Sequence, residues 1–323
     1  DWFTSIDLKD AYFHVPIYPP HRKYLRFAFR GVCYEYTVLP FGLSLSPGVF
    51  VRCTEAAIAP LRKQGIRLAT YLDDWLLLAR SQREAVTHTQ ILVRHLLDLG
   101  FVLNHEKSVL APTQNIIFLG LELNSVSLTA RLSSDRVLRL RSCLASFCLL
   151  RAVPFRLCLR LLGLMASVIL VVPLGRLHMR GFQRWVAALR LHPARHGARR
   201  VVVTSECIRA LRPWRRPTFL EQGVPLGPIV SRKVITTDAS MSGWGGIHEG
   251  RCVRGLWSQN LRQFHIYYLE LLAVFLSLKR FLPLISGCHI LVRIDNTTTV
   301  AYINRQGGFR SLRLHALAHK LIL

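Results

Sequence analysis

Between residues 68 and 79 the chain reads Leu68-Ala-Thr-Tyr-Leu-Asp73-Asp74-Trp75-Leu-Leu-Leu-Ala79. Two apolar runs flank an acidic pair, which predicts a β-hairpin with both carboxylates at its tip. Further upstream, Asp1-Trp-Phe-Thr-Ser-Ile-Asp7 alternates like a strand and also ends on a carboxylate. Aspartate favours turns for purely local reasons, so the pair alone does not establish a function.

Carboxylates that converge from neighbouring strands suit chemistry that depends on magnesium. Mg²⁺ takes oxygen ligands in octahedral geometry, and phosphoryl transfer to a growing strand uses two such ions about 3.5–4 Å apart. Asp7, Asp73 and Asp74 are therefore candidate metal-binding residues.

A second set of acids lies in the last 90 residues, where acidic side chains are scarce. Each is embedded among apolar residues, where an unpaired charge is costly. A metal ion or an arginine partner would offset that cost, and the residues alone leave both readings open. The set consists of Asp238 after the strand 234–237 and before the expected turn at 243–246, Glu270 in the apolar helix 266–282, and Asp295 after the strand 290–294.

Composition limits the classes of protein that this chain can represent. Its 323 residues are 51% hydrophobic, which excludes a disordered tail and a single small module. The net charge of +25 points to a polyanionic partner, nucleic acid or an anionic membrane surface. No CxxC pair has a matching His or Cys pair among the eight cysteines, so we expect neither a zinc site nor a disulfide framework, and a reducing compartment.

Charge and composition predict three parts: 1–130, 131–229 and 230–323. Residues 131–233 carry a net charge of +17 and read as helices, beginning with N-cap candidates Ser133 and Ser134. The apolar run 161–175 is too short to span a bilayer, so we expect a buried helix there. Because the chain starts at Asp1 and stops inside a helical pattern, we expect it to be a piece of a longer polypeptide.

Three successive motifs resemble those of reverse transcriptases: Asp7-Leu-Lys-Asp-Ala-Tyr12-Phe-His-Val-Pro16, Leu39-Pro-Phe-Gly42-Leu-Ser-Leu-Ser-Pro47 and Tyr71-Leu-Asp-Asp74. The resemblance implies that Asp7, Asp73 and Asp74 are metal-binding catalytic carboxylates of a polymerase palm. Gly100-Phe-Val-Leu-Asn-His-Glu-Lys107-Ser resembles the next motif, which implies that Lys107 protonates the departing pyrophosphate, with a solvated surface lysine as the alternative. Phe118-Leu-Gly120-Leu-Glu-Leu resembles the hairpin that grips the primer end.

The same resemblance implies a set of substrate-binding residues. Tyr12 matches the aromatic steric gate that crowds the 2′ position of the incoming nucleotide, although a core tyrosine is the alternative. Retroviral enzymes commonly have glutamine where this chain has Phe41, and the phenylalanine form resembles retrotransposons. The full set for template and nucleotide contacts is Tyr12, Phe41, Gly42, Tyr71, Arg22 and Lys23. The last two are included because they belong to a basic cluster with Arg26, for which a solvated charged strand is the alternative.

Thr-Asp238-Ala-Ser with its following glycines, Leu-Glu270-Leu-Leu-Ala and Ile-Asp295-Asn-Thr-Thr resemble the ribonuclease H fold. The resemblance implies that the three carboxylates are catalytic and bind two Mg²⁺ ions for cleavage of the RNA strand of an RNA–DNA hybrid. It covers about two-thirds of such a domain, so we expect the domain to be incomplete at its C-terminus.

The order of these motifs implies an α+β polymerase palm with incomplete fingers, a basic helical thumb and connection, and an α/β ribonuclease H-like domain. We therefore expect an RNA-directed DNA polymerase with ribonuclease H activity, most similar to DIRS-type retrotransposons. Its expected partners are an RNA template, a DNA primer, RNA–DNA hybrid and dNTPs, with Mg²⁺, or Mn²⁺, as cofactor and no membrane. We expect an intracellular location, cytoplasmic or nuclear. The alternatives are an inactive nucleic-acid-binding remnant and, less favoured, a membrane-surface protein.

Overall fold

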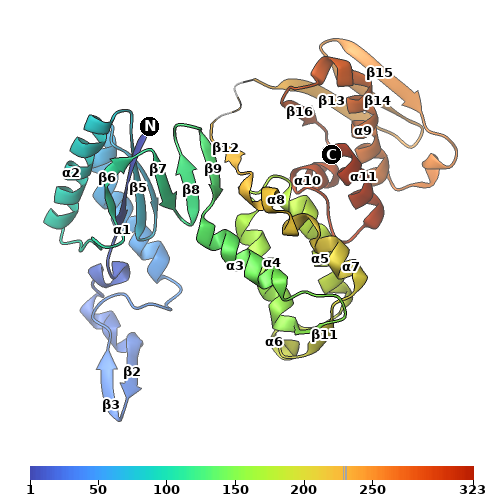
Figure 1. Cartoon of the computed structure of the whole chain (residues 1–323). Coiled ribbons are helices and arrows are strands. Elements are labelled where there is room, and N and C mark those ends of the chain that lie inside the picture. The colour runs from blue at the N-terminus through green and yellow to red at the C-terminus, as the bar shows by residue number, and fades with distance from the viewer. Residues whose placement is uncertain (228, 230) are drawn as a thin grey trace. The chain divides into compact units, whose positions relative to one another are not determined.

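The computed structural model describes residues 1–227, 229 and 231–323 (Figure 1). The chain divides into two compact units, residues 1–133 and 134–323. The expected boundary near residue 230 falls where residues 228 and 230 lie outside the described part. Among the described helices, none is long and apolar enough to cross a membrane.

The first unit is built on an antiparallel sheet with the strand order β4-β5-β1-β6. Its strands are β1 (Trp2–Asp7), β4 (Arg67–Tyr71), β5 (Asp74–Ala79) and β6 (Val109–Thr113). One face carries Ile6, Trp75 and Leu77, which pack with buried residues of helices α1 (Ser46–Lys63) and α2 (Gln82–Asp98). The predicted strand 1–7 and hairpin 68–79 are therefore confirmed.

The other face of this sheet carries a second, smaller core. Phe3, Leu76 and Ile116 are buried together there. Ile116 belongs to a meander of β7 (Asn115–Phe118), β8 (Leu121–Asn124) and β9 (Thr129–Leu132). The sheet is thus covered on both faces, which keeps the β1–β5 pair central and well fixed.

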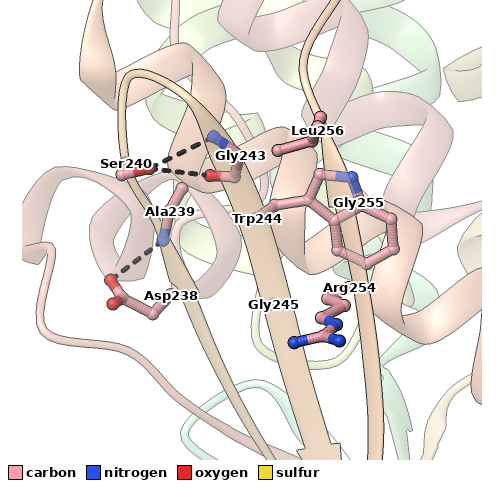
Figure 2. Close-up of a pocket in the computed structure, with 9 residues that line it drawn as sticks. All are labelled: Asp238, Ala239, Ser240, Gly243, Trp244, Gly245, Arg254, Gly255 and Leu256. Carbon is pink, nitrogen blue, oxygen red and sulfur yellow. Dashed lines mark hydrogen bonds between the residues drawn. The ribbon is translucent and has the colours of Figure 1, made fainter.

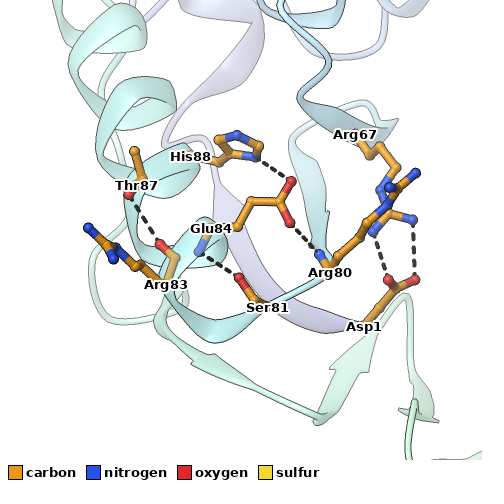
Figure 3. Close-up of polar contacts among 8 residues, drawn as sticks. All are labelled: Asp1, Arg67, Arg80, Ser81, Arg83, Glu84, Thr87 and His88. Atoms are coloured by element: carbon orange, nitrogen blue, oxygen red, sulfur yellow. Dashed lines mark hydrogen bonds and ion pairs between the residues drawn. The ribbon is translucent and has the colours of Figure 1, made fainter.

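Helix α2 begins at the N-cap residue Ser81, in the sequence Ser81-Gln-Arg-Glu84 (Figure 3). The Glu84 amide donates to Ser81 Oγ at 3.2 Å, and the Glu84 carboxylate accepts from the Arg80 amide at 2.7 Å. The Arg80 amide is the main reason why the pKa of Glu84 is lowered. This cap fixes the start of the helix that follows β5 directly.

Between β1 and α1 the chain forms short helices and an exposed hairpin. These elements are η1 (Ala11–His14), η2 (Pro19–Leu25), β2 (Arg26–Phe29) and β3 (Val32–Glu35). In the hairpin, Phe27 stacks on Tyr34 with ring centroids 5.6 Å apart, and Arg26 forms an ion pair with Glu35.

The second unit starts with helices, as its sequence predicts. They are α3 (Ser134–Ala145), α4 (Phe155–Val168), α5 (Gly175–Ala188), α6 (Pro193–His196), α7 (Ser205–Leu211), η3 (Pro213–Arg215) and α8 (Pro217–Glu221), with β10 (Ala152–Pro154) pairing β11 (Arg200–Val202). The expected single helix over 161–175 is wrong, because α4 ends at Val168 and Leu170 is 79% exposed. Pro173 explains the break, since its ring clashes with the carbonyl four residues earlier.

Residues 233–323 form a mixed sheet with helices. The strand order is β15-β14-β13-β16, where β13 (Lys233–Ala239) and β16 (Ile290–Arg293) are parallel. The chain reaches β16 from β15 through α9 (Ile266–Ile285), which packs on β13 and β14. The other elements are β14 (Gly243–His248), β15 (Arg251–Leu256), η4 (Leu261–Gln263), α10 (Thr297–Asn304) and α11 (Leu312–Ile322).

The expected turn at residues 243–246 is wrong, because these residues are part of β14 and the turn is made by residues 240–242. The glycines serve packing instead. A Cβ at Gly246 would overlap Ser277 of α9, and one at Gly243 would lie 2.6 Å from the Gly255 carbonyl oxygen. Their spacing therefore lets β14 lie close to the helix and to the neighbouring strand.

Candidate active sites

Strand register brings the first three acids together. Asp7, the last residue of β1, pairs with Asp74, the first residue of β5. The Leu8 amide donates to the Asp73 carbonyl at 3.0 Å. Residues more than sixty positions apart are thus adjacent at one end of the sheet, and all three acids are half-buried.

The turn that carries Asp73 has an unusual backbone. Leu72 has φ = 52°, in the left-handed region that a leucine rarely adopts. Buried Trp75 holds the turn, because its Nε1 donates to the Leu72 carbonyl at 2.8 Å. Tyr71, at the end of β4, is 59% exposed beside this tip.

The segment 100–108 lies along the end of β1. The Asn104 amide donates to the Asp7 carbonyl at 2.8 Å, and Ser108 Oγ accepts from the Asp7 amide at 3.0 Å. Sequence reasoning selected only Lys107 from this segment and missed Asn104 and Ser108. Polar residues at both ends of the Asn104-to-Ser108 stretch were the available signal.

Electrostatics link these residues. Burial raises the pKa of Asp74, and the neighbouring carboxylates Asp73 and Asp7 raise it further. Exposed Lys107 acts in the opposite direction, so its ammonium group lies within range of the acidic site. A cation at this position would relieve the repulsion among the three carboxylates.

The predicted nucleotide-contact residues form an aromatic group. The half-buried Tyr12 ring lies 4.9 Å from the Phe41 ring and 5.6 Å from that of buried Phe50, measured between centroids. Phe41 is 61% exposed, and Gly42 beside it has φ = 90°, which suits glycine. The tyrosine is therefore held by its neighbours and is not part of the deep core.

Arg22 and Lys23 lie in η2, and Arg22 Nε donates to the Ile17 carbonyl at 3.2 Å. Arg22 is half-buried and Lys23 is exposed, where its ammonium group lies over the Tyr24 ring, 5.2 Å from the centroid.

In the second unit, Asp238, Glu270 and Asp295 converge. One carboxylate oxygen from each lies within 4.8 Å of the others, and this is the single such group in the described part of the chain. Asp238 comes from β13, Glu270 from α9, and Asp295 follows β16, which is the parallel neighbour of β13. The sequence-predicted set is therefore brought together.

Glu270 is the buried member of this cluster, with 4% of its surface exposed. Desolvation raises its pKa to about 7, and Asp295 and Asp238 add to the shift. Its Oε2 is buried without a hydrogen-bond partner. An orphaned buried oxygen among three carboxylates fits a divalent cation, whereas no described arginine pairs with any of the three.

A cavity of about 680 Å³ opens beside Asp238 (Figure 2). Asp238 on β13 pairs with Gly245 on β14, and Gly245 pairs in turn with Arg254 on β15. Ser240 Oγ orders the adjoining turn by accepting from the Gly243 amide at 3.1 Å. Asp238 is the member of the acidic cluster that lines this cavity, and Asp238 and Asp295 are both exposed.

Comparison with known proteins finds similarity over the first part of the chain and, at lower identity, over most of its length. Residues 1–123 match the reverse transcriptase (RNA-dependent DNA polymerase) family. The Gag-Pol polyprotein of Walleye dermal sarcoma virus is 31% identical over 120 residues, 37% of this chain and 7% of that protein. The enzymatic polyprotein of Cauliflower mosaic virus (strain Strasbourg) is 24% identical over 331 residues, 94% of this chain and 43% of that protein.

Solved structures show the same fold. Foamy viral protease-reverse transcriptase in complex with RNA/DNA hybrid matches with a TM-score of 0.62 at 17% identity, over 99% of this chain and 42% of that chain. Foamy viral protease-reverse transcriptase dRH in complex with double-stranded DNA matches with a TM-score of 0.60 at 17% identity, over 93% of this chain and 51% of that chain. The expected fold class, a palm with helices and a ribonuclease H-like domain, is confirmed. The chain spans less than half the length of the two viral polyproteins.

Proposed function

We propose that this chain, whose residues 1–123 form a reverse transcriptase domain of the kind found in retroelement and viral Pol polyproteins, is an RNA-directed DNA polymerase. The observation that carries the proposal is the pairing of Asp7 with Asp74 beside Asp73. In the proposed reaction a primer 3′-hydroxyl attacks the α-phosphate of a dNTP. Lys107, whose charge lowers the pKa of Asp74, would give a proton to the departing pyrophosphate.

The acidic residues fit divalent cations as cofactors. Asp7, Asp73 and Asp74 would hold Mg²⁺, or Mn²⁺, in the first unit, and Asp238, Glu270 and Asp295 would do so in the second. Bound there, the cations would supply Lewis-acid stabilisation of the negative charge on the reacting phosphate.

We further propose that the second cluster gives the protein ribonuclease H activity on the RNA strand of an RNA–DNA hybrid. Its support is the 4.8 Å grouping of three carboxylates from β13, α9 and the end of β16. We propose that the chain belongs to the DIRS-type subgroup of retrotransposons. This proposal rests on the resemblance of the segments 39–47, 162–167 and 295–307 to such elements. Such an element would also encode a tyrosine recombinase.

The test of the polymerase is Mg²⁺-dependent dNTP incorporation on a primed RNA template. The variant Asp73→Asn/Asp74→Asn should lose incorporation, because neutral amides cannot balance the cations. Asp98→Asn, at the exposed end of α2, is the matched control and should keep the wild-type rate.

A folded wild type that binds hybrid but incorporates no dNTP with either metal would favour an inactive binding remnant. The nuclease is tested separately with Asp238→Asn against Glu249→Gln, whose exposed carboxylate lies outside the cluster. Hybrid cleavage should be lost in the first variant only.

A further inference from the structure

Helix α10 is short and begins at Thr297, two residues after Asp295 of the acidic cluster. Asn296 is its N-cap, with Oδ1 accepting from the Thr299 amide at 3.0 Å. Thr299 is the one residue of the helix that is buried. Because helices of this length are marginal on their own, tertiary contacts fix its position. Tyr302 and Ile303 pack against the core formed by α9 and α11, and further contacts lie at the C-terminal end of the helix.

The C-terminal end of α10 contacts α5. Arg180 Nη2 donates to the carbonyl of Arg305, the C-cap residue, at 2.8 Å. Gln306 Oε1 accepts from the Leu177 amide at 3.1 Å. Leu177 is in the first turn of α5, where amides have no acceptor within the helix. Each helix thus satisfies an otherwise unpaired backbone group of the other.

The turn that follows α10 also packs against α11. Gln306 and Gly307 have φ values of 52° and 82°. A Cβ at Gly307 would lie 2.5 Å from Nδ1 of buried His315 on α11, so only glycine fits. Arg180 is itself ordered, because its Nη1 donates to Gln183 Oε1 at 2.9 Å.

We propose that Arg180 and Gln306 are positioning residues for the acidic cluster, acting through α10 on Asp295. The proposal rests on the nuclease function proposed above. Neither residue belongs to the cluster, and their hydrogen bonds join the helical segment to the end of the helix that follows Asp295. Loosening that end would move Asp295 relative to Asp238 and Glu270.

The test compares Gln306→Ala and Arg180→Met with the exposed controls Gln222→Ala and Arg209→Met in the full chain. Outer contacts that orient metal ligands typically contribute 10–100-fold, so kcat for hybrid cleavage should fall about tenfold in the first pair. KM should stay within about twofold, because the interaction that is lost is not a substrate contact. Gln306→Glu keeps an acceptor at the α5 N-terminus and should retain the wild-type kcat.

Two further measurements separate this proposal from the nuclease function. Mn²⁺ binding by electron paramagnetic resonance should be about tenfold weaker in Gln306→Ala and Arg180→Met. Amide hydrogen exchange over residues 297–307 should be faster in both, with α9 unchanged. If the wild type cleaves nothing while these two shifts appear, the nuclease function fails and the positioning role stands. Unchanged Mn²⁺ binding, or unchanged kcat in an active protein, would overturn the positioning role.

Discussion

At the scale of single residues, the backbone of Leu72 sets the direction of the acidic hairpin. Its φ of 52° turns the chain so that Asp73 and Asp74 follow at the end of the β1–β5 pair. A left-handed conformation costs a residue with a Cβ roughly 1–2 kcal/mol. Such strain persists only where the surroundings determine it, here through the Trp75 hydrogen bond to the Leu72 carbonyl.

We therefore predict that glycine at position 72 makes the protein more stable than alanine does, the reverse of their order inside a helix. Leu72→Gly and Leu72→Ala both remove the side chain, but only glycine relieves the strain, so the glycine variant should be more stable by about 1 kcal/mol. At Ile91, in the middle of α2, the same pair should differ by about 1 kcal/mol in the other direction. Urea unfolding of the four variants measures both differences, and equal signs at the two positions would contradict the prediction.

Tyr12 is the residue through which the proposed polymerase would select sugars. Its ring is held between Phe41 and Phe50, so shortening it should open space without unfolding the unit. In Tyr12→Ala the ratio of kcat/KM for dNTP over rNTP should fall roughly tenfold or more, because a steric clash is removed. Phe13→Ala, which loses a different ring contact with Phe41, should leave the ratio near wild type. An unchanged ratio in Tyr12→Ala would make the tyrosine a packing residue.

At the scale of elements, α11 buries a histidine in basic surroundings. His315 is 8% exposed, and desolvation lowers its pKa to about 4, with further lowering by Arg184, His319 and Arg180. It is therefore neutral in the folded protein, whereas in the unfolded chain it takes up a proton near its ordinary pKa of about 6.5. The contribution of His315 to the stability of the second unit should therefore be complete above pH 6.5 and be lost as the pH is lowered toward 4, whereas Glu270, with its pKa raised to about 7, contributes in the opposite direction.

The measurement is the unfolding free energy of the wild type and His315→Gln between pH 4 and 7. One histidine contributes a slope of up to about 1.4 kcal/mol per pH unit in this window. His315→Gln should lose that part of the slope, while His289→Gln, at an exposed position of the same unit, should keep it. Identical slopes in wild type and His315→Gln would mean that the histidine is protonated in the folded state.

Across the whole molecule, local signals in the sequence predict most of the helices and strands but fewer of the contacts between them. The hairpin 68–79 and the apolar helix around Glu270 follow from neighbouring residues. The break at Pro173 and the placement of Gly246 against Ser277 depend on particular neighbours, so the run 161–175 and the glycines at 243–246 were misread.

The candidate sites divide in the same way. Their carboxylates were predictable, because acids at strand ends are visible in sequence, and a family resemblance linked them. The contact of Leu177 with Gln306 joins positions 129 residues apart and has no local signature. Neither Ser108 beside Asp7 nor the left-handed Leu72 could be assigned without the strand register.

The net charge of +25 should determine how the affinity of the whole molecule for nucleic acid depends on salt. Each phosphate neutralised by a basic side chain releases counterions, so the affinity for RNA–DNA hybrid should fall steeply with salt, with a slope near −0.9 for each contact. Residues 131–233 hold most of the excess, and Arg195 and Arg199 are exposed there without a side-chain partner in the described structure. Arg195→Gln/Arg199→Gln should reduce the slope by about 2 if both bind phosphates.

Arg139→Gln is the control, because Arg139 already pairs with Asp135 at 2.7 Å and its replacement should change the slope little. Fluorescence anisotropy with a labelled hybrid between 50 and 300 mM salt, without divalent metal, measures all three slopes. A wild-type affinity independent of salt would place recognition in uncharged contacts and remove the basic segment from the binding surface.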